Sequence, residues 1–181
     1  MKAYFIQYRP FLLFLLRFFV SYILLVVAYQ LYLNQFNVSR FEVDGFTRLV
    51  AEQSKQLLLL FDYTVGLVDS DVEPSVIVLV GQVPFVKIVE GCNAISIMIL
   101  FAAFVVAFNR GFLRTTLFIL AGVIFIHILN IFRIPLLIIG LLRFPEYKIV
   151  LHDIVFPVII YGGVFLLWIL WINRFSLYGK K

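Results

Sequence analysis

Long runs of apolar residues, separated by short polar segments, dominate the hydrophobic pattern of this chain. A span of about 20 apolar residues is needed to cross a hydrocarbon core about 30 Å thick. The pattern predicts four transmembrane helices at about residues 11–33, 92–108, 115–134 and 154–172. The third apolar run continues to Leu142 but is interrupted by Arg133 and Pro135, so its span is expected to end near 134. The fold class predicted is therefore an all-α integral membrane protein with about four spans, in a single membrane domain over residues 1–181.

Residues 34–90 form the one substantial polar segment, and its charge balance is acidic. Apolar residues recur there mostly at steps of three and four, which predicts a small amphipathic helix. The residues of this pattern are Phe46, Leu49, Val50, Gln53, Leu57, Leu60 and Phe61, all apolar except Gln53. The β-branched runs Val76–Val80 and Val83–Val89 flank Gly81-Gln82 and predict a β-hairpin. Pro84 makes the second arm an edge strand whose open side is available to an extended peptide. We expect this whole segment to be extracytoplasmic.

Composition supports the membrane class and narrows the functions. Of the 181 residues 64% are hydrophobic and 18% aromatic, and the net charge of +5 needs no nucleic acid to explain it, because membrane proteins collect basic residues in cytoplasmic loops. With four spans the clusters of basic residues all fall on one side of the membrane, which predicts that both termini are cytoplasmic. The basic residues in these clusters are Lys2, Arg9, Arg110, Arg114, Arg174, Lys180 and Lys181. A single cysteine and two histidines argue against a disulfide framework and a metal centre, so we expect no cofactor.

The only cysteine, Cys92, stands where the polar segment gives way to the second apolar run. Unpaired backbone N–H groups in the first turn of a helix favour a reactive thiolate at such a position. Taken alone, a single cysteine is better explained as a small buried packing residue. Other reactive residues at the same depth would reverse that preference.

The first such residue is Arg133. At 1.5 Å per residue, Arg133 lies about 27 Å from Thr115, near the outer membrane face, where an arginine in an apolar run is a functional candidate and snorkelling is the alternative. Asn130 lies one turn earlier on the same face, where it could orient the guanidinium; the alternative is an amide that serves helix packing. Arg17, within the first run, is better explained as a snorkelling side chain.

His152 opens the fourth span at the same outer face and is preferred as the acid–base partner. His127 lies about 18 Å along the third helix and is interpreted as a helix-packing group. Asp153 neighbours His152, but adjacent residues of an α-helix do not face each other, so we expect Asp153 to act as a helix-capping or first-turn acid. Topology thus predicts Cys92, Arg133 and His152 at one membrane surface, on three different helices.

These residues stand in three spaced motifs: Glu90-Gly91-Cys92-Asn93-Ala94-Ile95, Asn130-Ile131-Phe132-Arg133-Ile134, and His152 at the start of the last span. In this the chain resembles the exosortase/archaeosortase family of membrane-embedded cysteine transpeptidases, and most of all its small exosortase F-type members. The resemblance covers roughly residues 83–163. The chain departs from the family pattern at Asn93 and Ala94, where many members have a small residue and glycine, and at Pro157, where glycine is common.

The resemblance implies that Cys92, Arg133 and His152 act together as the catalytic residues, with Glu90, Asn93 and Asn130 in supporting positions. It implies cleavage of exported proteins at a C-terminal sorting signal, made of a short motif, a transmembrane helix and a basic tail. The expected reaction forms a thioester near the outer face of the cytoplasmic membrane, and water or another nucleophile resolves it.

Two other functions remain open on the residues alone. A non-catalytic membrane scaffold would use Cys92 for packing and pair Arg133 with a partner helix. A small permease would line a path with Arg133 and His127. The enzyme requires Cys92 and not His127, the permease requires the reverse, and the scaffold requires neither.

Overall fold

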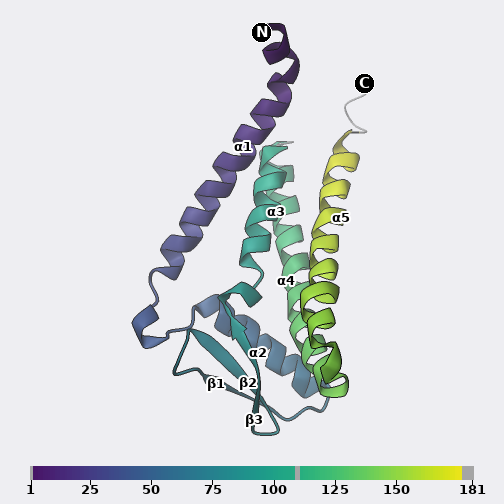
Figure 1. Ribbon diagram of the computed structural model, residues 1–181. Coiled ribbons are helices and arrows are strands. Elements are labelled where there is room, and N and C mark those ends of the chain that lie inside the picture. Colours follow the sequence, from purple (N-terminus) through teal and green to yellow (C-terminus); the bar gives the residue numbers. More distant parts are fainter. Residues whose placement is uncertain (1, 109–110, 177–181) are drawn as a thin grey trace.

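The computed structural model describes residues 2–108 and 111–176, and the predicted basic residues Arg110, Lys180 and Lys181 lie outside these ranges. The chain is mostly helical, with one small sheet (Figure 1). Its main elements are α1 (Lys2–Leu33), α2 (Gly45–Leu60), β1 (Val65–Asp69), β2 (Ser75–Val80), β3 (Val83–Val89), α3 (Ile95–Ala107), α4 (Phe112–Arg143) and α5 (Phe156–Ser176). Short 3₁₀ turns occur at η1 (Val38–Arg40), η2 (Glu90–Cys92) and η3 (Pro145–Tyr147), and a π-helical stretch η4 (Val150–Val155) leads into α5.

The long helices run roughly alongside one another, and the sheet and α2 lie together at one end of them (Figure 1). The start of α1 and the end of α5 lie at the opposite end, so α1 and α4 both run toward the sheet while α3 and α5 run away from it. The segment η2 joins the sheet to α3 and therefore sits where the sheet meets the helices.

Among the described residues, three helical stretches are long and apolar enough to cross a membrane: Tyr8–Leu33, Phe112–Arg143 and Val150–Asn173. The predicted second span is shorter than expected, because α3 has 13 residues and begins at Ile95. At 1.5 Å per residue it covers about 20 Å, less than the hydrocarbon core of about 30 Å. The structure therefore supports the membrane class through three helices.

The predicted end of the third span was wrong. Helix α4 continues through Pro135 to Arg143, for 32 residues or about 48 Å. Proline removes one backbone donor, which costs a helix less when the surrounding turns are held by packing. Here Pro135 is itself buried, as are Ile134 and Ile138 on either side of it. The part of α4 beyond the proline packs with the sheet end of the molecule.

The predicted β-hairpin is confirmed, since β2 and β3 pair antiparallel around Gly81 and Gln82 with Val80 opposite Val83. The sequence missed β1, which pairs antiparallel with β2 and makes the sheet three-stranded in the order β1-β2-β3. Strand β1 includes Gly66 and has only five residues, so its sequence carries little period-two signal. Strand β3, with Pro84 near its start, lies at an edge as predicted.

The amphipathic helix is also present as α2, and the Asp44 side chain caps it by accepting from the backbone N–H groups of Phe46 and Thr47 at 3.0 and 2.9 Å. The predicted packing face was only partly right. The buried residues of α2 in the structure are Thr47, Val50, Ala51, Ser54 and Leu58. Leu60 is 77% exposed and Phe61, just after the helix, is 52% exposed. Apolar residues occupy two sides of this helix, and periodicity alone does not tell which side meets the sheet.

Two hydrophobic cores hold the elements together. One lies between the sheet, α2 and the end of α4, and includes Val50, Val76, Ile88, Ile134 and Ile138. The other lies between α3, α4 and α5, and includes Phe101, Val105, Ile126, Val164 and Trp171. Phe46 packs against both cores. The boundary between the cores is also the level at which the chain turns from β3 into α3.

Candidate functional site

Cys92 is the last residue of the 3₁₀ turn η2, three residues before α3 begins. It is partly buried and packs against the core of the sheet, α2 and α4. The next turn is made by Ala94, which has a left-handed backbone with φ of 64°. An L-residue rarely adopts this conformation, so the surrounding contacts must hold it. The thiol thus sits on a tightly turned backbone, whereas the sequence placed it on the helix itself.

Asn130 anchors this turn to α4. Its side-chain Nδ2 donates to the carbonyl oxygen of Cys92 at 2.8 Å, and the asparagine is completely buried. Asn130 was predicted to orient the Arg133 guanidinium, and the bond that its amide makes is to the Cys92 backbone. The hydrogen bond nevertheless brings two of the sequence motifs together across 38 positions of the chain.

A second polar network holds Asn93, which is 1% exposed. Its Nδ2 donates to the hydroxyl of Tyr29 at 3.0 Å and to the hydroxyl of Thr47 at 3.1 Å. Its Oδ1 accepts from the backbone N–H of Ile95 at 2.9 Å, so Asn93 caps α3. The Tyr29 hydroxyl in turn donates to Glu90 at 2.7 Å. Residues on both sides of Cys92 are therefore fixed to α1 and α2.

Sequence reasoning missed Tyr29 and Thr47 in this network. A tyrosine near the end of an apolar run is usually an interface anchor. Nothing in the local pattern indicates that the Tyr29 hydroxyl meets an asparagine 64 positions later.

Arg133 lies on α4, one turn beyond Asn130 and next to Ile134 of the core that contacts Cys92. Counting from Phe112, it stands about 32 Å along the helix. Its Nε is buried and has no hydrogen-bond partner, and the same holds for Asn130 Oδ1. Buried polar atoms are nearly always paired, so each one without a partner calls for an explanation, of which a catalytic role is one. Arg17 differs, because it is exposed on α1.

His152 lies on the π-helical stretch η4 and is exposed. Asp153 lies in the first turn of η4, as expected of a first-turn acid. The expectation that it does not meet its neighbour was wrong, because its carboxylate lies 2.5 Å from Nδ1 of His152. In a π-helix successive side chains are turned less far apart than in an α-helix, which lets neighbours meet, and such stretches are frequent at functional sites. The contact directs Nδ1 toward the carboxylate and leaves Nε2 as the ring nitrogen for other partners.

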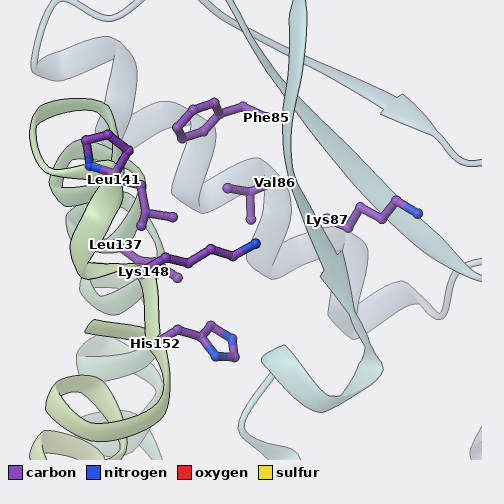
Figure 2. Close-up of a pocket in the computed structure, with 8 residues that line it drawn as sticks. Phe85, Val86, Lys87, Leu137, Leu141, Lys148 and His152 are labelled. Carbon is purple, nitrogen blue, oxygen red and sulfur yellow. The ribbon is translucent and has the colours of Figure 1, made fainter. Parts of the chain in front are cut away.

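His152 also lines a cavity of about 460 Å³ between β3 and the connection from α4 to α5. The other lining residues are Phe85, Val86, Lys87, Leu137, Leu141, Pro145 and Lys148. Figure 2 shows His152 and Lys148 extending from the helical side of this cavity toward β3. The cavity therefore opens beside the strand that leads into Cys92.

The structure brings Cys92, Asn93 and Asn130 together, and Glu90 joins them through Tyr29. In the described ranges no hydrogen bond joins the Cys92 thiol to Arg133 or His152. Catalytic hydrogen bonds often form only when substrate is bound. His127 lies on α4 one turn before Asn130, with its ring 5.4 Å from that of Phe46. Within the described part of the chain, no three His, Cys, Asp or Glu residues gather in a way that would hold a metal ion.

The fold and the site together define a helical protein with three apolar helices of membrane-spanning length, a small sheet, and a partly buried cysteine at the junction between them. No protein-family profile, curated protein or solved structure matches this chain.

Proposed function

We propose that this protein is a membrane-embedded cysteine peptidase or transpeptidase, with Cys92 as nucleophile and Arg133 and His152 as its catalytic partners. The resemblance of its three motifs to the exosortase/archaeosortase family suggests this activity. The observation that carries it is the 2.8 Å hydrogen bond from Asn130 to the Cys92 carbonyl, which ties the cysteine motif to α4 one turn from Arg133.

In the proposed reaction the Cys92 thiolate attacks the carbonyl carbon of the scissile peptide bond and forms a C–S bond. Arg133 stabilises the negative charge that develops on the carbonyl oxygen, a contribution of about 2.7–4 kcal/mol when such a donor is preorganised. The C–N bond then breaks, and His152 gives a proton to the leaving amine. Water or an acceptor amine attacks the resulting thioester, His152 takes the proton back from that nucleophile, and the thiolate leaves.

The substrates proposed are exported proteins with a C-terminal motif, transmembrane helix and basic tail. The protein would reside in the cytoplasmic membrane with four crossings and with Cys92 at the extracytoplasmic side. The direction of the helices supports four crossings, because α3 carries the chain from the sheet end back to the start of α4 (Figure 1). Residues on either side of α3 would complete the crossing that its own length of about 20 Å leaves short.

The first test concerns the nucleophile. We expect Cys92→Ala to insert and fold normally but to leave a substrate with the tripartite signal uncleaved. We expect Cys92→Ser to retain little activity, because a hydroxyl has no accessible anionic form near neutral pH. The measurement is the fraction of processed substrate in membranes with matched amounts of each variant. Full processing by the alanine variant would rule out the thioester mechanism.

The second test separates charge from donor geometry at Arg133. Lysine keeps the positive charge but lacks the planar fork of donors, so Arg133→Lys should lose most of the processing activity. Arg17→Lys is the matched control, because Arg17 lies in another apolar helix and is exposed. His127→Ala should leave processing intact. Equal processing by the two lysine variants would show that Arg133 only anchors the helix at the membrane surface.

A further inference from the structure

Strand β3 has one free edge. It pairs with β2 on one side only, from Val83 opposite Val80 to Val89 opposite Ser75. In the described ranges, no other backbone hydrogen bond reaches the residues of this strand. A free edge with unpaired N–H and C=O groups is a template for another extended chain.

The free edge borders the cavity of about 460 Å³ described above, a size typical of ligand sites. Figure 2 shows Phe85 and Val86 on the β3 side and Leu137 and Leu141 on the helical side. A side chain that points from an added strand into this space would meet apolar walls on both sides. The cavity therefore favours an apolar side chain within the bound segment.

The charge of the cavity is positive. Lys148 forms no ion pair within the described part of the chain, and Figure 2 shows its side chain reaching across the cavity toward Val86. Lys87 is different, because its amine is paired with Glu73 at 2.5 Å and is turned away from the cavity in the same view. One uncompensated ammonium group beside an apolar wall is complementary to a ligand with a carboxylate.

The cavity also leads toward the proposed nucleophile. Strand β3 ends at Val89, and the 3₁₀ turn that follows ends at Cys92. A 3₁₀ turn rises about 2 Å per residue and an extended strand about 3.3 Å, so a chain paired with the end of β3 needs about two more residues to reach the thiol. His152 stands on the opposite wall of the cavity.

We infer that an extended peptide of the substrate binds as a fourth strand on the free edge of β3, with an apolar side chain in the cavity and an acidic side chain opposite Lys148. This deepens the proposed function and rests on it. Main-chain hydrogen bonds along β3 supply affinity for an extended segment of any sequence, and the cavity and Lys148 supply the selectivity. The pairing delivers a backbone carbonyl of the peptide to Cys92.

The experiment uses the full chain in detergent and chloromethyl ketone probes, which alkylate a thiolate with loss of chloride. The long probe is acetyl-Glu-Ala-Val-Ala-Ala chloromethyl ketone, whose glutamate and valine side chains lie on the same side of an extended strand, and the short one is acetyl-Ala chloromethyl ketone. Mass spectrometry gives the second-order rate constant for alkylation of Cys92, and each value is divided by that for iodoacetamide. We expect the long probe to react at least about tenfold faster, because each added main-chain hydrogen bond contributes about fivefold.

Two changes test the mode of binding. In an added strand, successive N–H groups point to opposite sides. N-methylation at one residue of the long probe should therefore slow alkylation about fivefold, and N-methylation at the next residue should have little effect. Lys148→Ala should slow the glutamate probe severalfold and leave a glutamine analogue unchanged, whereas Lys148→Arg should preserve the preference. Lys55→Ala, on α2, is the matched control.

The outcomes separate this inference from the proposed function. Equal normalised rates for the long and short probes, or equal effects of N-methylation at adjacent residues, would overturn strand addition while leaving Cys92 as a reactive nucleophile. Equal rates for the glutamate and glutamine probes on the unmodified chain would overturn the role of Lys148. Failure of Cys92 to react with any of the probes would overturn both the docking site and the cysteine mechanism.

Discussion

The hydrogen bond from Asn130 to the Cys92 carbonyl makes a sharp prediction about the variant Asn130→Ala. The donor and acceptor are 2.8 Å apart, and Asn130 is completely buried. Alanine is a good helix former and fits the middle of α4, so the helix itself should be unharmed. The variant removes the side-chain hydrogen bond from α4 to η2, and it leaves a small space where the amide was.

The magnitude follows from the loss of this contact. A hydrogen bond contributes about 0.5–1.5 kcal/mol net, and leaving a buried carbonyl without its partner costs about 1–3 kcal/mol. For a chain of 150–250 residues each kcal/mol lowers Tm by about 2–4 °C, so a cost of about 1–3 kcal/mol lowers Tm by about 2–12 °C. Because the Cys92 turn is loosened locally, we also expect the rate of alkylation of Cys92 by iodoacetamide to change.

Both quantities can be measured on detergent-solubilised protein, as thermal unfolding and as the rate of thiol alkylation. Asn173→Ala is the control, because Asn173 lies exposed near the end of α5. If Asn130→Ala matched the original protein in both Tm and alkylation rate, Asn130 would have no role in positioning the cysteine.

Two further predictions concern the packing around the site. Gly122→Leu should destabilise the protein strongly or prevent its accumulation, because even a Cβ there would lie 2.2 Å from the ring of Phe101. Gly162→Leu is the control and should accumulate normally, because nothing lies within 4 Å of its Cβ position. Size-exclusion chromatography measures the accumulation of both variants. Tyr29→Phe removes the hydroxyl that bonds both sides of the cysteine turn and should lower stability by about 1–3 kcal/mol and alter Cys92 alkylation, whereas Tyr22→Phe should change neither.

Much of the fold could be predicted from the sequence, because the signals are local. Apolar runs of about 20 residues indicate membrane-spanning helices, and three of the four predicted spans correspond to helices of sufficient length. The hairpin depends on the two-residue turn Gly81-Gln82, and helix α2 on apolar residues that recur every three or four positions. Strand β1 was missed, since five residues that include a glycine carry too little period-two pattern.

The candidate site was predicted only as a set of residues at one depth. Counting residues along helices placed Cys92, Arg133 and His152 near the same surface, but a residue count says nothing about rotation of one helix against another. The close contact of His152 with Asp153 was missed because the π-helical geometry of η4 has no sequence signature that we could identify.

Spacing along this chain is thus enough to determine the membrane class, the hairpin, the helix α2 and the motifs that carry the proposed chemistry. Tertiary structure alone decided that Asn130 binds the Cys92 carbonyl, that Tyr29 meets Asn93, and that a cavity opens between β3 and the α4–α5 connection. These contacts join residues 38 and 64 positions apart. Hydrophobic periodicity reports which side of an element is buried, whereas a hydrogen bond between elements depends on their relative position and rotation, which all the packed side chains set together.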